Sequence, residues 1–185
     1  MSRAQVLILP GWNSSGPEHW QSRLEAAHPD FVRVEQRDWA QPNLEDWAGT
    51  LEAYVARATG PVVLVAHSLA CVTVAHWAGA DESRVRAALL VAPADVERPD
   101  VPPELVGFAP VPLRPLPFPS VLVASRNDPY CSLERARTFA HAWGSRLEDA
   151  GQAGHINTAS GHGEWPLGET LLKDLLNRCT ETHAS

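Results

Sequence analysis

The chain has 185 residues, 44% of them hydrophobic, and carries a formal net charge of −7. This length suits a single domain over residues 1–185, and a globular chain of this size buries roughly 70% of the surface that its unfolded form exposes. An acidic chain without a cluster of Lys or Arg disfavours nucleic acid as a partner. No apolar run approaches the ~20 residues that a membrane-spanning helix needs, so we expect no membrane partner either.

The cysteines and the first residues bear on the compartment. Cys71, Cys131 and Cys179 are odd in number and widely spaced, so they predict neither a disulfide framework nor a zinc site. The apolar run Val6–Leu9 follows a short polar start without a small-residue cleavage site, and it predicts a first strand instead of a signal peptide. We therefore expect a cytoplasmic protein that needs no metal and no cofactor.

Short β-branched runs alternate with longer segments of helical period, which is typical of βαβ units around a parallel sheet. Continuous apolar runs such as Val62–Val65 suit strands that helices cover on both faces. The predicted strands are Gln5–Leu9, Val32–Gln36, Val62–Ala66, Ala87–Val91, Val121–Ser125 and Arg146–Asp149. The predicted helices are Pro17–Ala27, Leu44–Ala58, Leu69–Gly79, Ser132–Trp143 and Gly168–Cys179, with Asn43 and Ser132 as caps. The pattern predicts an α/β fold with a mostly parallel central sheet.

The segment from Pro93 to Pro119 interrupts this pattern, because it contains nine of the sixteen prolines. Proline lacks a backbone N–H and clashes with the preceding helical turn, so the segment cannot be an ordinary helix or a central strand. We expect a stiff, extended excursion. It either lies near the mouth of a pocket or is a surface connection without a further role.

The strongest local signal is the string from Ala66 to Ala70, Ala-His-Ser-Leu-Ala, between an apolar strand and a helix. A nucleophile elbow, usually G-x-S-x-G, places its serine on a strained strand-to-helix turn where Oγ is exposed and the next N–H can reach an oxyanion. Alanine fits the flanking positions by size but adds strain in an unusual backbone conformation. Ser68 is therefore the predicted nucleophile. The alternative is a serine that only caps the helix, which the same position would suit.

A serine nucleophile needs a base within hydrogen-bond reach and a third group that fixes the tautomer of the base. In hydrolases with a nucleophile elbow these follow in the order serine, acid, histidine, each on a loop after a strand. Asp128 follows the strand ending at Ser125 by three residues and is the predicted acid. Asp95 is the alternative acid, and the competing role of Asp128, which precedes a proline, is that of a turn former.

Of the later histidines, His155 is the predicted general base, because it lies in a glycine-bearing loop after the last predicted strand. His162 is the alternative base. His141 falls inside a predicted helix, and His183 lies near the end of the chain. Three suitable residue types, in the right order on three predicted strand-end loops, indicate a Ser-His-Asp triad.

The loop after the first strand is expected to complete an oxyanion hole. Gly11 lets the backbone approach the substrate, so we predict that the backbone N–H groups of Trp12 and Leu69 bind the oxyanion. Gly11, Asn13 and His67 are the predicted substrate-binding residues. The loop contains neither G-x-x-x-x-G-K-[ST] nor G-x-G-x-x-G, which argues against nucleotide binding.

Together these strings resemble the small serine hydrolase family that includes the retinoblastoma-binding-protein-type hydrolases and the bacterial YdeN-like proteins. The strings span almost the whole chain in order, and their combination is far more specific than any one of them. The matching pieces are Pro10–Trp20, Gln36–Trp39, Ala66–Leu69, Ser125–Tyr130, Gly154–Asn157 and Ser160–Pro166.

The resemblance implies a compact α/β-hydrolase fold with helices on both faces of the sheet and no large cap domain. It also implies the triad of Ser68, Asp128 and His155. Larger α/β hydrolases carry an inserted helical cap at about the point of the proline-rich segment. The chain departs from many relatives at Ala70, where they have glycine.

The expected activity is that of a carboxylesterase-like serine hydrolase. His155 would take the Ser68 proton as Oγ attacks an ester or thioester of a small acyl group, and the acyl-enzyme would then be hydrolysed. Trp12 and Trp39 are either apolar walls of the pocket or part of the core. The alternative, suggested by the alanines beside the serine, is a hydrolase-like scaffold that binds a protein or small molecule without turnover. No H-x-H or H-E-x-x-H spacing supports a metal-dependent hydrolase.

Overall fold

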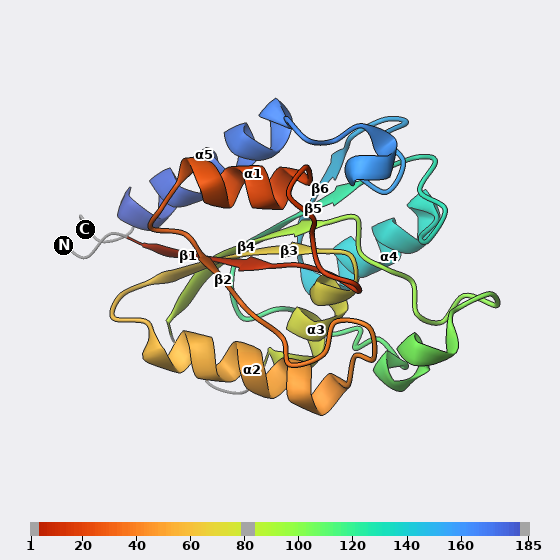
Figure 1. Cartoon of the computed structure of the whole chain (residues 1–185). Helices are drawn as coiled ribbons and strands as arrows, with labels where there is room; N and C mark the ends of the chain where they lie inside the picture. Colours follow the sequence, from red (N-terminus) through yellow and green to blue (C-terminus); the bar gives the residue numbers. More distant parts are fainter. Residues whose placement is uncertain (1–3, 79–83, 182–185) are drawn as a thin grey trace.

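A computed structural model describes residues 4–78 and 84–181. Within these residues the strands form one six-stranded sheet in which every neighbouring pair is parallel, in the order β2-β1-β3-β4-β5-β6 (Figure 1). The strands are β1 (Gln5–Leu9), β2 (Val32–Arg33), β3 (Val62–His67), β4 (Val85–Val91), β5 (Ser120–Ala124) and β6 (Arg146–Asp149). The predicted α/β fold with a mostly parallel central sheet is confirmed.

Helices cover both faces of this sheet, so the fold has three layers (Figure 1). The helices are α1 (Trp20–Ala27), α2 (Leu44–Arg57), α3 (Leu69–Trp77), α4 (Leu133–Trp143) and α5 (Pro166–Glu181), with short 3₁₀ helices η1 (Pro103–Phe108) and η2 (Thr158–Ser160). Alternation along β3 divides its side chains between two cores. Val63 and Val65 pack under α1 and α5, whereas Leu64 and Ala66 pack under α2, α3 and α4.

Two elements are shorter than predicted. β2 ends at Arg33 instead of Gln36, because the chain leaves the sheet edge after the N–H of Val34 donates to the Ile8 carbonyl oxygen at 2.9 Å. α1 begins at Trp20 instead of Pro17, because the side chain of His19 caps it.

The other helix boundaries agree more closely. The predicted caps Asn43 and Ser132 accept hydrogen bonds from the N–H groups of Asp46 and Arg135. α5 begins two residues before the predicted Gly168, at a proline, which is tolerated in a first helical turn. The predicted end of the third helix at Gly79 lies outside the described residues.

The proline-rich segment, residues 93–119, packs against the face of the sheet that α2, α3 and α4 cover. Leu105 and Phe108 of η1 belong to the core on that face, and the ring of Phe108 lies edge-on to that of Trp47, with centroids 5.9 Å apart. The segment is therefore a packed connection with a short 3₁₀ helix, more folded than the extended excursion that we predicted.

The strand order creates a switch point between β1 and β3. The chain leaves β1 towards β2 and leaves β3 towards β4, so two adjacent parallel strands are followed by connections that diverge. In open α/β sheets, ligands bind in the crevice at the carboxyl ends of such strands. The loops that follow Leu9 and His67 start at this crevice.

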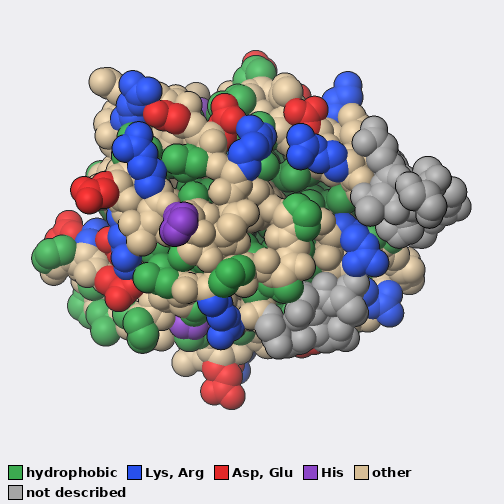
Figure 2. All heavy atoms as spheres, turned by 180° about the vertical axis from the view of Figure 1, so that it is seen from behind, with side chains coloured by type: hydrophobic (Ala, Val, Ile, Leu, Met, Phe, Trp, Pro, Cys, Tyr) green, Lys and Arg blue, Asp and Glu red, His purple; other side chains and the backbone are tan. Residues whose placement is uncertain are grey.

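On the face shown in Figure 2, basic and acidic side chains are interspersed. Among residues 4–78 and 84–181, none of the helices combines the length and the apolar character that crossing a bilayer demands.

Substitutions at two positions of α2 test the assignment of its buried face. Leu51 is fully buried, whereas Gly49 is exposed and has open space where a Cβ would lie. Leu51→Ala should lower the free energy of unfolding by about 2–5 kcal/mol, because it leaves a cavity. Gly49→Ala should raise it by about 0.5–1 kcal/mol, because glycine loses more entropy in a helix. Urea unfolding followed by circular dichroism measures both, and changes of the same sign would contradict the assignment.

Candidate active site

Ser68 lies in the turn between β3 and α3, with φ 58° and ψ −121°. Residues other than glycine rarely adopt this conformation, and such strain is typical of a nucleophile elbow. Ser68 occupies the N-cap position of α3, but its side chain makes no capping hydrogen bond. Its Oγ instead lies 2.8 Å from Nε2 of His155, so the helix-cap alternative does not account for this serine.

Close packing around the turn explains the small residues. Ala66 and Ala70 are both buried. A Cβ added to Gly11 would lie 2.9 Å from the His67 carbonyl oxygen, 2.9 Å from Ser68 Cβ and 3.4 Å from the Leu69 nitrogen. The loop after β1 can therefore approach the turn this closely only because Gly11 has no side chain.

His155 and Asp128 come from the loops after β6 and β5. The Nδ1 atom of His155 lies 3.0 and 2.9 Å from the two carboxylate oxygens of Asp128. The Asp128 side chain is only 2% exposed, and its Oδ1 also accepts a hydrogen bond from the Tyr130 N–H at 2.9 Å. The structure therefore brings Ser68, His155 and Asp128 into one hydrogen-bonded series.

Two further polar side chains connect the loop of the acid with the loop of the base. Asn127 Oδ1 accepts a hydrogen bond from the Gly154 N–H at 2.8 Å, and Ser125 Oγ accepts one from the Ala153 N–H at 3.0 Å. Ser125 Oγ also donates to Asn127 Oδ1 at 2.9 Å. Sequence reasoning gave these residues no role, although both belong to the string Ser125–Tyr130 that carries the resemblance.

His67, a predicted substrate-binding residue, is 5% exposed, and its Nε2–H donates to the His155 carbonyl oxygen at 2.9 Å. Burial, and then the neighbouring His155 and His19, hold the pKa of His67 well below its usual value of 6.5. A neutral His67 therefore supports the backbone of His155.

A pocket of about 310 Å³ opens at Ser68. Its lining comes from the loop after β1, the turn at Ser68 and the segment that follows His155: Gly11, Trp12, Ser14, Gly16, His19, His67, Ser68, His155, Asn157, Thr158 and Ala159. No residue of the proline-rich segment is among them, and Trp39 is absent from this lining as well. Trp39 instead packs edge-on against Trp47, with ring centroids 5.6 Å apart.

The predicted oxyanion and substrate residues differ in how they are placed. Trp12 lines the pocket, and its backbone N–H donates to no backbone carbonyl of the described residues, while its indole N–H is held by Ala40 O at 2.9 Å. Leu69 is buried, but its backbone nitrogen lies only 3.4 Å from the place where a Cβ of Gly11 would be.

Asn13, a predicted substrate-binding residue, is exposed and absent from the lining, and its N–H donates to Trp39 O at 3.0 Å. The structure therefore does not bring Asn13 to the pocket.

The alternative acid and base have other partners. Asp95 accepts a hydrogen bond from Arg135 Nε at 3.3 Å, and His162 Nδ1 lies 3.0 Å from Ser160 Oγ. Neither residue makes a hydrogen bond with Ser68 or His155 in the described part of the chain. His183 lies outside the described residues.

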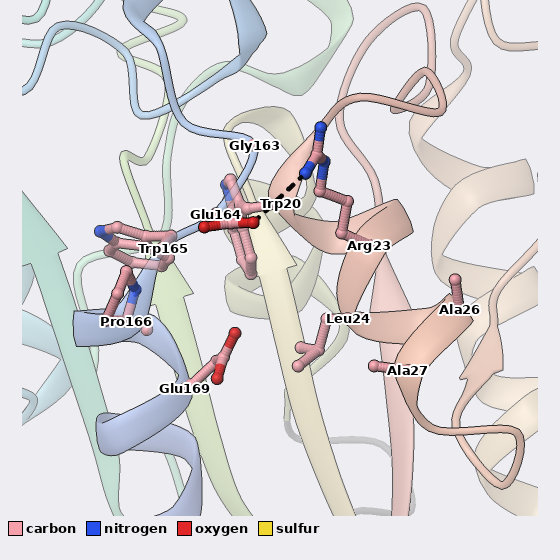
Figure 3. A pocket seen from close by; sticks show the side chains of 11 residues that line it. Trp20, Arg23, Leu24, Ala26, Ala27, Gly163, Glu164, Trp165, Pro166 and Glu169 are labelled. Atoms are coloured by element: carbon pink, nitrogen blue, oxygen red, sulfur yellow. Dashed lines mark ion pairs between the residues drawn. The ribbon is translucent and has the colours of Figure 1, made fainter.

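A larger pocket, of about 610 Å³, lies between α1 and the start of α5 (Figure 3). Trp20 and Trp165 form part of its wall, with ring centroids 4.8 Å apart. The indole N–H of Trp20 donates to the Ile156 carbonyl oxygen at 2.9 Å. Ser68, Asp128 and His155 are all absent from the lining of this larger pocket, so it is separate from the site at Ser68.

Solved structures of other proteins share this fold. A protein from Pectobacterium atrosepticum SCRI1043, described as a YdeN-like hydrolase, has a TM-score of 0.83 at 34% identity, over 94% of this chain and 91% of that one. Alpha/beta hydrolase domain-containing protein 10 from mouse has a TM-score of 0.73 at 19% identity, over 96% and 91% of the two chains. The predicted compact α/β-hydrolase fold is confirmed.

Sequence comparison agrees with this result. The hydrolase YdeN of Bacillus subtilis (strain 168) is 37% identical over 71 residues, which cover 36% of this chain and 37% of that relative. A model of the family described as serine hydrolase matches residues 6–174. This match includes Ser68, Asp128 and His155 and extends over most of the chain, so the chain belongs to the serine hydrolase family.

Proposed function

We propose that this hydrolase cleaves esters or thioesters of small acyl groups, with Ser68 as nucleophile, His155 as general base and Asp128 as the orienting acid. One observation carries the proposal: a continuous series of hydrogen bonds runs from the Asp128 carboxylate through both nitrogens of His155 to Ser68 Oγ. A serine hydroxyl becomes a strong nucleophile only beside such a base.

In the first half of the reaction, His155 Nε2 takes the proton of Ser68 Oγ as the oxygen attacks the substrate carbonyl carbon. The negative charge that develops on the carbonyl oxygen is stabilised by the backbone N–H groups of Trp12 and Leu69. His155 then gives its proton to the leaving alcohol or thiol, and the acyl group remains on Ser68. The Asp128 carboxylate holds Nδ1–H of the imidazole and stabilises its positive charge.

In the second half, water attacks the acyl-enzyme carbonyl while His155 accepts a proton from it. The tetrahedral intermediate collapses, Ser68 Oγ recovers the proton from His155, and a carboxylic acid leaves. The volume of about 310 Å³ at Ser68 is at the lower end of ligand pockets, which span roughly 300–1,000 Å³. This size supports a short acyl group.

The nucleophile and the base are tested with a fluorophosphonate probe and p-nitrophenyl butyrate. Wild-type protein should carry one adduct on Ser68, located by peptide mass spectrometry. The variants Ser68→Ala and His155→Ala should carry no adduct. Their kcat should fall by about 10⁴-fold or more. His162→Ala is the matched histidine control and should retain labelling. A folded wild-type protein with neither adduct nor turnover would favour the binding scaffold.

Asn127 tests the connection between the acid and base loops. Asn127→Ala should lower kcat by up to about 10²-fold with little change in KM, because Gly154 loses its acceptor and His155 is held less firmly. Asn127→Asp keeps an acceptor oxygen and should recover most of kcat. Equal losses in the two variants, measured by steady-state kinetics, would argue against this positioning role.

Gly11 tests the approach of the oxyanion loop. In Gly11→Ala the new Cβ would push the loop away from the His67 carbonyl and Ser68, and so displace the Trp12 N–H. Loss of one oxyanion donor should lower kcat by about 10²–10³-fold. Gly107→Ala, at a glycine with open space around it, is the control. Wild-type kinetics in Gly11→Ala would contradict the assigned oxyanion hole.

A further inference from the structure

His19 is a buried side chain at the pocket that the reaction steps above do not use. It is 5% exposed and lines the pocket at Ser68. Its ring lies edge-on to that of His67, with centroids 4.8 Å apart. His19 therefore packs against His67, the residue that directly precedes Ser68.

The hydrogen bond at one nitrogen of His19 fixes its tautomer. Nδ1 accepts the backbone N–H of Gln21 at 3.1 Å and thereby caps α1, so the proton of the neutral ring is on Nε2. Burial, followed by the charge of Arg33, lowers the pKa of His19 to about 4. At neutral pH the ring is an uncharged donor.

This donor has no acceptor among the described residues of the protein. The only hydrogen bond of the His19 side chain is the one at Nδ1, and the rings that adjoin it belong to His67 and Trp20. The described side-chain atoms that are both buried and without a hydrogen bond do not include His19 Nε2, so this N–H is accessible from the pocket that His19 lines. An accessible N–H without a protein acceptor favours a pocket occupant that can accept its hydrogen bond.

The rest of the lining indicates the charge of that occupant. The lining includes the polar residues Ser14, Asn157 and Thr158, and it contains no Asp, Glu, Lys or Arg. Arg33, whose charge acts on His19, is outside this lining and is paired with Glu25 at 2.7 Å. A charged substrate group would therefore lose its hydration in the pocket without an unpaired opposite charge in the lining. An uncharged oxygen acceptor fits the site.

We propose that His19 binds the substrate through Nε2–H, and that the preferred ester or thioester carries an uncharged oxygen acceptor in addition to its reacting carbonyl. The proposal rests on the proposed hydrolase function. The acceptor is an ether, hydroxyl or carbonyl oxygen on either the acyl or the alcohol half of the substrate. His19 is then a specificity-determining residue.

The test compares substrates that differ by one oxygen. The first pair is p-nitrophenyl methoxyacetate and p-nitrophenyl butyrate, in which an oxygen replaces one methylene of the acyl half. The second pair is 2-methoxyethyl acetate and butyl acetate, in which an oxygen replaces one methylene of the alcohol half. The measured quantity is the ratio of kcat/KM within each pair, compared between wild type and variants. This comparison cancels the intrinsic reactivity of the esters.

Two variants separate the donor from the helix cap. Asn at position 19 can still cap α1 but has no group at the place of Nε2, whereas Gln can present an amide N–H there. His19→Asn should lower the oxygen-to-methylene ratio about fivefold to tenfold in one substrate pair, and His19→Gln should preserve most of it. His141→Asn, on the exposed face of α4, is the matched control. Thermal unfolding of each variant verifies folding.

The pair in which the ratio falls tells which half of the ester carries the acceptor, and either result supports the proposal. An unchanged ratio in both pairs for His19→Asn would overturn it, as would equal falls in His19→Asn and His19→Gln. If wild-type protein hydrolyses none of the four esters and takes no fluorophosphonate adduct, the proposed hydrolase function fails, and this proposal fails with it.

Discussion

The close approach of two loops at the carboxyl ends of β1 and β3 is the constraint on which the site depends. The loop after β1 packs so closely against the turn at Ser68 that a methyl group at position 11 would not fit between them. This turn holds Ser68 in a strained backbone conformation, in which its hydroxyl makes no capping hydrogen bond and lies against His155 Nε2. The parallel register of β1 and β3, from Gln5 with Val62 to Leu9 with Ala66, places these two loops side by side.

A buried glutamine on α1 ties the carboxyl ends of β1 and β3 together. Gln21 on α1 is fully buried, donates to the carbonyl oxygens of Leu9 and Val65, and accepts a hydrogen bond from Ser15 Oγ. Each of these bonds joins α1 to β1, to β3 or to the loop after β1. Because a buried amide without partners would be costly, this satisfied arrangement fixes α1 against the strand ends. It thereby fixes His19, two residues away.

Burial also divides the histidines of the site by role. His67 and His19 have lowered pKa values and stay neutral, one supporting the His155 backbone and the other capping α1. In the proposed reaction His155 gains a positive charge, and two permanently charged imidazoles beside it would oppose that charge. Neutral neighbours avoid that repulsion, and the Asp128 carboxylate lies 2.9 Å from Nδ1 of His155.

The sequence by itself determined the fold class, five of the six strands within about two residues, and the loops that carry Ser68, Asp128 and His155. Hydrophobic periodicity and the short strings around these residues are local, so they can be found without coordinates. Only the tertiary structure decided which side chains meet: that Asn13 stays outside the pocket, that Asn127 and Ser125 connect two loops, and that the proline-rich segment packs away from Ser68. The physical reason is that these contacts join residues distant in the chain, and their geometry follows from strand register and close packing, which no local pattern specifies.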